Sequence, residues 1–184
     1  MITKITHNWN IKNNYPILDK DQKQHEDKRE SDYILNQEEY ILKVNGVWFK
    51  DFCLEIGTPR EEAHKYHLSE LSNVFKSLRT FGIYRDNIEI YHYCPVARLD
   101  VSTAEHYHPT DNQAKRYLVQ YEDGMVYNSM FDSCYHWQIA TQVTFDEALK
   151  MAMGHMAMAT YIDSYLEAWI LVMDWVEEPM NFDM

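Results

Sequence analysis

The sequence predicts an α+β fold in which an antiparallel sheet, built from two hairpins plus additional strands, packs on two main helices. An Asn-Gly pair at 45–46 and an Asp-Gly pair at 123–124 each stand between apolar segments. Both pairs tolerate the positive φ angles of a type I′ hairpin turn. Helix starts are indicated where a threonine precedes an apolar periodic segment, at Thr58 and Thr144. The resulting order of elements resembles two degenerate copies of a ββα unit.

The N-terminal part of the chain differs in composition from the rest. Residues 2–11 are loosely patterned as a strand, and residues 19–32 are almost continuously charged and polar. Mixed charges without apolar periodicity are typical of a solvated linker. We therefore predict an N-terminal arm and charged linker over 1–32 and a single α+β domain over 33–184. The first hairpin of that domain joins strands at 40–44 and 47–49.

The first main helix is predicted over about 59–81. Pro59 suits the first helical turn and Gly82 suits the end of the helix. Five apolar side chains recur at helical spacing: Leu71, Val74, Phe75, Leu78 and Phe81. Four further strands are expected, at 88–94, 117–121, 125–127 and 137–143, with a polar loop over 102–113.

The second main helix is predicted over 145–178 and ends the domain. Thr144 and Glu147 have the spacing of a capping box, and Pro179 marks the end. At 100° per residue one side of this helix is acidic and the other apolar. The acidic stripe consists of Asp163, Glu167, Asp174, Glu177 and Glu178. The apolar side consists of Tyr161, Tyr165, Ala168, Trp169, Val172 and Val176. We interpret Met151, Met153, Met156 and Met158 as core packing.

The charge of the chain is concentrated towards its C-terminal end. The formal net charge is −12, and residues 117–184 hold 11 acidic side chains against one basic one, Lys150. This balance argues against direct binding of nucleic acid or of an anionic membrane. It favours a basic protein partner that contacts the acidic stripe, the alternative being that the stripe is the solvated face of a packed helix.

The cysteines and the apolar segments indicate a cytoplasmic protein. Cys53, Cys94 and Cys134 are odd in number and widely spaced, which predicts neither a disulfide framework nor a zinc site. The N-terminus lacks the apolar run of a signal peptide. The longest apolar region, 151–173, contains His155, Asp163 and Glu167, which disfavours a membrane span.

Four histidines are the only candidates for metal chemistry that the spacing suggests. His64 and His67 stand three residues apart in the first predicted helix, and His106 and His108 would share one side of an extended loop near Asp111. The plainer interpretation is a histidine pair at the edge of the core and a polar loop. No phosphate-binding loop, nucleophile elbow or dinucleotide fingerprint is present in the sequence. We therefore predict no cofactor and no resident metal.

These observations favour a non-enzymatic acidic protein that inhibits a basic partner, for instance a nucleic-acid-binding enzyme, with carboxylates standing in for DNA phosphates. In size, charge and lack of catalytic motifs the chain is similar to the small acidic inhibitors of phages and mobile elements, including anti-CRISPR and antirestriction proteins. No residue role follows from that likeness. The alternatives are an immunity protein or antitoxin against a basic nuclease, and a small metal-dependent hydrolase that uses the four histidines. A homodimer through the apolar side of the long helix is a further hypothesis.

Overall fold

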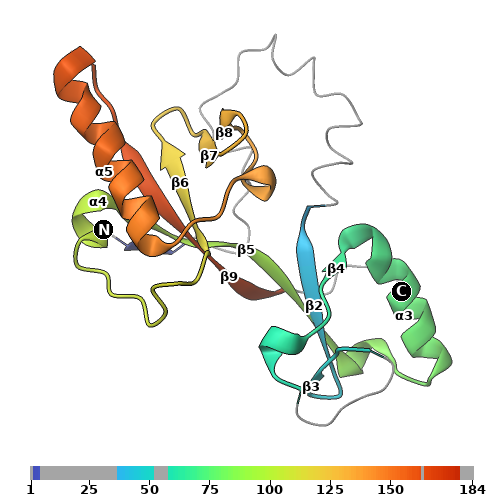
Figure 1. Ribbon diagram of the computed structural model, residues 1–184. Helices are drawn as coiled ribbons and strands as arrows, with labels where there is room; N and C mark the ends of the chain where they lie inside the picture. Colours follow the sequence, from blue (N-terminus) through green and yellow to red (C-terminus); the bar gives the residue numbers. More distant parts are fainter. Residues whose placement is uncertain (1, 5–36, 52–57, 163, 179–184) are drawn as a thin grey trace, which may run out of the picture. The chain divides into compact units, whose positions relative to one another are not determined.

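The computed structural model describes residues 2–4, 37–51, 58–162 and 164–178. These residues form an antiparallel sheet with three α-helices, so the predicted α+β class is confirmed (Figure 1). They divide into two compact units. Unit 1 contains residues 2–4, 95–162 and 164–174, and unit 2 contains residues 37–51, 58–94 and 175–178.

Two long strands contribute residues to both units. Strand β5 (Ile88–Asp100) passes from unit 2 into unit 1, and β9 (Ala168–Glu178) passes from unit 1 into unit 2. The predicted arm over 1–32 lies outside the described residues except for β1 (Ile2–Lys4), which pairs antiparallel with β5. The single domain predicted over 33–184 stays a prediction.

In unit 2, strand β2 lies between its partners in the sheet. It pairs antiparallel with β3, β4 and β5. Asn45 and Gly46 have φ angles of 50° and 78°, so the predicted Asn-Gly hairpin turn is confirmed. The bounds of the remaining elements are β2 (Glu39–Val44), β3 (Val47–Trp48), η2 (Arg60–Glu62), β4 (Tyr66–His67), α3 (Leu68–Thr80) and η3 (Arg85–Asn87). The core of unit 2 forms where Leu71, Phe75 and Leu78 of α3 pack on the sheet.

The first main helix is shorter than predicted. α3 begins at Leu68, not at Pro59, because the intervening chain forms the 3₁₀ turn η2 and then pairs with β2 as β4. Tyr66 is buried by this pairing, and the Glu70 carboxylate accepts a hydrogen bond of 2.7 Å from the His67 amide at the start of α3. Strand pairing has therefore overridden the helix-start signal at Thr58. The predicted stop is confirmed, since α3 ends at Thr80 and Gly82 has a φ of 78°.

In unit 1, β6 pairs antiparallel with β7 and with β9, and β7 pairs with β8. The predicted Asp-Gly hairpin is confirmed, with Gly124 at a φ of 84°. The strand predicted over 137–143 is a 3₁₀ turn, although Val143 bridges to Tyr117. The bounds are α4 (Val101–Ala104), β6 (Tyr117–Tyr121), β7 (Val126–Asn128), β8 (Asp132–Cys134), η4 (Trp137–Ile139) and α5 (Phe145–Ile162). The core of unit 1 lies between α5 and β5, β6 and β9.

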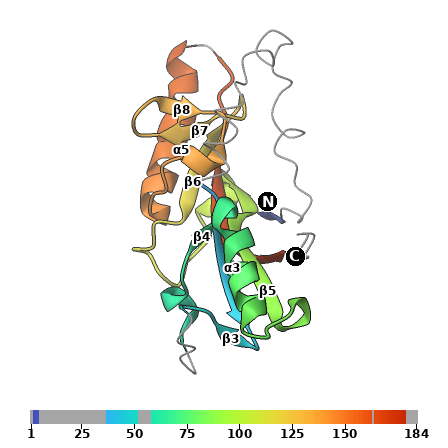
Figure 2. The same cartoon turned by 90° about the vertical axis from the view of Figure 1, so that its right-hand side faces the viewer.

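The prediction of one helix over 145–178 is wrong. α5 ends at Ile162, and the chain returns as β9, whose Leu171 pairs with Leu118 of β6 (Figures 1 and 2). Residues 168–173 are all apolar because β9 lies between two neighbouring strands and is covered on both sides. Such a run has no period of two, so periodicity cannot distinguish it from a buried helix. The predicted capping box at the start of α5 is confirmed by the bonds between Thr144 and Glu147.

The two units have a similar order of elements, while the duplication of a ββα unit stays a prediction. Each has three strands before its helix and one after it, as β2-β3-β4-α3-β5 in unit 2 and as β6-β7-β8-α5-β9 in unit 1. In both, the last strand pairs antiparallel with the first: Tyr40 faces His92 in unit 2, and Tyr117 faces Val172 in unit 1. α3 and α5 therefore occupy corresponding places in the two units.

Candidate interaction surface

The predicted acidic stripe does not form. Asp163 lies outside the described residues, and Glu167 stands in the turn before β9. Asp174, Glu177 and Glu178 follow along β9, where side chains alternate between the two faces of the sheet, so Glu177 points away from the other two. Asp174 belongs to unit 1 and the two glutamates to unit 2. A continuous row of carboxylates therefore has no structural basis in the described residues.

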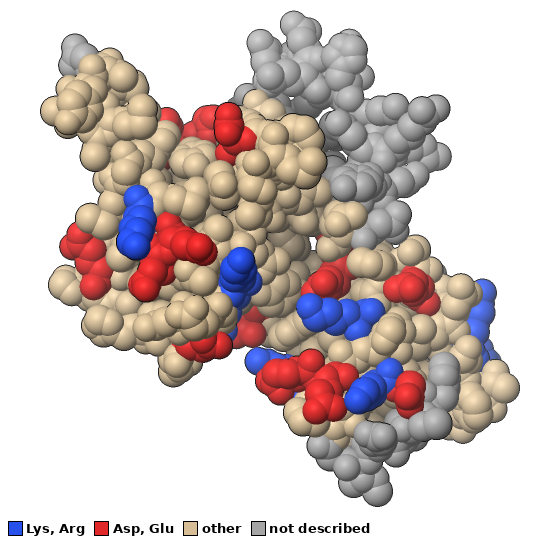
Figure 3. Space-filling model, viewed as in Figure 1, with Lys and Arg blue, Asp and Glu red and all other residues tan. Residues whose placement is uncertain are grey.

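The C-terminal half of α5 carries an exposed apolar surface instead. Only Phe145, Ala148 and Ala152 of this helix are fully buried, and all three lie in its first half. The α5 tip surface consists of Met153, Met156, Met158, Tyr161 and Ile162, continued beyond the helix by Tyr165. Tyr161 is 88% exposed and Ile162 is 54% exposed. Figure 3 shows the described residues at this end of α5, at the upper left, without a basic or acidic side chain on their visible face. The interpretation of Met153, Met156 and Met158 as core packing is wrong.

The α5 tip surface differs from the usual solvent face of a helix in this protein. In α3, at the corresponding place in unit 2, the exposed side chains are all polar: Ser69, Glu70, Ser72, Asn73, Lys76, Arg79 and Thr80. In the first half of α5 the exposed residues are Asp146, Glu147 and Lys150. The apolar arc begins only at Met153 and covers about 240° of the helix circumference at 100° per residue. A surface helix needs an apolar stripe of only about 100°.

Carboxylates border the α5 tip surface. Glu122, in the turn between β6 and β7, receives a hydrogen bond of 2.7 Å from His155 Nε2 and one of 3.3 Å from the Glu167 amide. Burial opposes ionisation of Glu122, but hydrogen bonds from its own backbone and from His155 outweigh it and lower the pKa of the carboxyl group. The hydrogen bond that Tyr165 donates to Glu167 raises the pKa of this exposed tyrosine. The border is therefore anionic at neutral pH.

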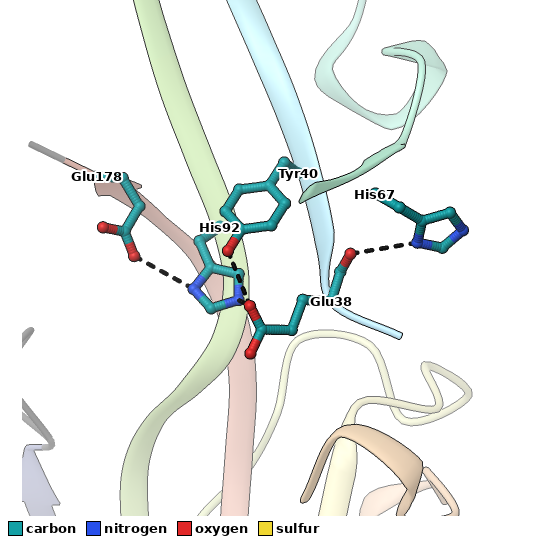
Figure 4. Close-up of polar contacts among 5 residues, drawn as sticks. All are labelled: Glu38, Tyr40, His67, His92 and Glu178. Carbon is teal, nitrogen blue, oxygen red and sulfur yellow. Dashed lines mark hydrogen bonds and ion pairs between the residues drawn. The ribbon is translucent and has the colours of Figure 1, made fainter. Parts of the chain in front are cut away.

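A second polar cluster lies in unit 2, around His92 (Figure 4). His92 Nδ1 is 3.2 Å from Glu178 Oε1, and Nε2 is 3.7 Å from Glu38 Oε2. The Tyr40 ring stacks on the imidazole with centroids 4.6 Å apart, and its hydroxyl donates to Glu38 at 2.8 Å. Burial, together with the Glu38 carboxylate, raises the pKa of Tyr40 far above its usual range. His67 Nδ1 lies 3.3 Å from the Glu38 backbone oxygen.

The His92 cluster joins the residue before β2 to β5 and to the end of β9. Glu178, predicted to contact a partner, is thus engaged within unit 2, with 29% of its side chain exposed. No motif in the sequence links His92 to Glu38 or Glu178. Strand pairing, with Tyr40 opposite His92, creates this contact.

The four histidines considered for metal binding are not gathered by the described structure. His64 and His67 are exposed and precede α3, so they do not form a pair on a helix at the edge of the core. His106 and His108 are exposed in the loop after α4, in unit 1. Over the described ranges, no group of three or more His, Cys, Asp or Glu side chains is arranged to hold a metal ion. The metal-dependent hydrolase therefore has no support from these residues.

The described cysteines do not favour nucleophilic chemistry. Burial is the main influence on Cys134 and raises the pKa of its thiol, which disfavours the reactive thiolate. Cys94 is half-buried on β5, and Cys53 lies outside the described residues. In the part of the chain that the structure describes, no helix has the length and apolar character needed to cross a bilayer.

Comparisons of the chain with protein-family models, with curated proteins and with solved structures gave no match.

Proposed function

We propose that the protein is a non-enzymatic binding protein that docks the α5 tip surface into an apolar groove on a basic partner protein. The exposed apolar half of α5 is the observation that carries this proposal. A large apolar surface that the fold itself does not cover is typical of a protein interaction site. Because the apolar arc covers most of the helix circumference, a groove that encloses the helix fits it better than a flat surface.

The charge around the α5 tip surface supports a basic partner. Glu122 and Glu167 border the surface, and Lys150 is the single basic side chain among residues 117–184. A second copy of the chain would bring two anionic borders together, which costs free energy, whereas a basic rim would attract them. We therefore favour a basic partner over the homodimer, and we make self-association an outcome of the test.

Basic surface patches, such as the rim expected around this groove, are typical of enzymes that bind nucleic acids. We propose that the protein inhibits such an enzyme by occupying a surface that the enzyme needs. Mimicry of DNA phosphates by a row of carboxylates on one helix no longer supports this role, because β9 replaces that part of the helix. An immunity protein or antitoxin against a basic nuclease would use the same α5 surface.

The test compares binding by two variants that change large hydrophobic residues of similar exposure. The double variant Met158→Ser/Ile162→Ser alters the α5 tip surface, and Tyr84→Ser alters an exposed residue of unit 2 as the matched control. The probe is the fraction of source-cell proteins that a cation exchanger retains, passed over each immobilised protein. Any protein retained by wild type is identified, purified and titrated against all three.

We expect the double variant to bind that protein at least about 10-fold more weakly than wild type, and the control to bind it unchanged. Affinity is also expected to fall with rising salt, because charges at the rim are screened. Equal loss in both variants, or unchanged binding by the double variant, would contradict the proposal. If wild type sediments as a dimer and the double variant as a monomer, the α5 tip surface binds a second copy of the chain and not a basic partner.

A further inference from the structure

The turn between β7 and β8 is held in one conformation by a buried asparagine. Asn128 is buried, and its Oδ1 accepts hydrogen bonds from the amides of Met130 at 2.8 Å and Phe131 at 3.2 Å. Its Nδ2 donates to the Ile139 carbonyl oxygen at 2.7 Å. One side chain thus ties the turn both to itself and to the neighbouring η4 segment.

Further contacts fix both sides of the same turn. The Ser129 amide donates to Thr141 Oγ1 at 2.8 Å, and the Thr141 hydroxyl donates to Ser129 Oγ at 3.1 Å. The Ser133 amide donates to the Phe131 carbonyl oxygen at 2.7 Å, and Asp132 adopts a φ of 62°. The turn is therefore ordered before any partner binds.

This ordered turn presents two large apolar side chains to solvent. Met130 is 81% exposed and Phe131 is 68% exposed. Neither contributes to the core of unit 1, although the backbone of the turn is held by the side chains of Asn128 and Thr141. Methionine and aromatic residues are enriched in the cores of protein interfaces. Anchors that are ordered in advance lose less conformational entropy on binding.

We propose that Met130 and Phe131 form a second anchor, which inserts into a small apolar pocket of the partner protein. This inference rests on the proposed function, because it assigns a second contact to the same partner. Asp132 in the turn and Asp123 in the preceding hairpin are exposed, so the pocket has a basic rim. The same charges repel an anionic membrane, which disfavours insertion of the turn into lipid.

The experiment uses two phenylalanines of equal exposure. Phe131→Ser removes the proposed anchor, and Phe81→Ser, at a residue also 68% exposed but in unit 2, is the matched control. The probe is the basic protein that the wild-type chain retains from the cation-exchange fraction, identified and purified. Because a central anchor typically contributes 2 kcal/mol or more, Phe131→Ser is expected to bind about 30-fold more weakly and Phe81→Ser to bind as wild type does.

The possible results separate this inference from the proposed function. If Phe131→Ser binds like Phe81→Ser while the α5 double variant fails to bind, the second anchor is overturned and the proposed function stands. If binding depends on Phe131 but not on α5, the proposed docking of α5 fails and the anchor stands. If no basic protein binds wild type specifically, both are overturned. If wild type binds phosphatidylcholine vesicles and Phe131→Ser does not, the turn inserts into lipid and the proposed pocket on a partner protein is overturned.

Discussion

Replacing Leu171 by alanine is expected to lower the free energy of unfolding by about 2–5 kcal/mol, the usual cost of deleting a buried leucine side chain. Leu171 is paired with Leu118 of β6 and is 0% exposed. A helix over 145–178 would place it on the same side as Asp174, facing solvent. There the substitution would change stability by no more than about 0.5 kcal/mol.

Thermal unfolding followed by circular dichroism measures this difference. For a chain of 184 residues, 1 kcal/mol shifts the midpoint by about 2–4 °C, so we expect Leu171→Ala to lower Tm by roughly 5–15 °C. The matched control is Tyr161→Ala, which the helix prediction places on the core side and the structure leaves 88% exposed. We expect Tm of the control to stay within about 2 °C of wild type. The opposite ranking of the two variants would refute the assignment of β9.

Three further predictions concern local contacts. Thr144→Ala removes the hydroxyl that caps α5 and is expected to cost about 1 kcal/mol in urea unfolding, whereas an unchanged midpoint would argue against the cap. Asn128→Ala is expected to make the two amides that it binds exchange rapidly with deuterium, and continued protection would show that the turn is ordered by other contacts. Because the pKa of Glu122 in the folded protein is below its usual value of 4.5, the stability it contributes is present above that pH and lost as pH falls through the lowered pKa. We expect Glu122→Gln to flatten this acid-induced loss of stability, and an identical pH profile in the variant would contradict it.

Predictions from the sequence succeeded where a few adjacent residues determine the backbone. The Asn-Gly turn, the end of α3 before Gly82 and the capping box of α5 are confirmed, because each needs only a local φ angle or a side chain within one helical turn. The predicted start of α3 was wrong because Tyr66 pairs with β2 as part of a strand and does not continue the helix. That pairing joins residues far apart in the sequence, which local signals do not record.

The prediction of an acidic stripe on one helix failed for a related reason, whereas contact of these carboxylates with a partner stays a prediction. Glu167 and Asp174 share one face only if the chain is helical, and a change from helix to strand redistributes every side chain. The methionines of α5 were assigned to the core because their residue type is usually buried. Whether these methionines are exposed depends on where α5 ends and on which elements pack beside it. The pattern of residues within the helix reveals neither.

Helix length explains why the apolar half of α5 is uncovered. α3 has 13 residues and packs on β2, which has six; at the standard rises both are about 20 Å long. α5 has 18 residues, about 27 Å, and packs on β6, whose five residues extend about 17 Å. About 10 Å of helix, or roughly seven residues, therefore extends beyond its strand. The fold does not require this extension, since α3 supports the corresponding unit without one. Apolar residues on it contribute little to the stability of the free protein, which is why we propose that a partner covers them.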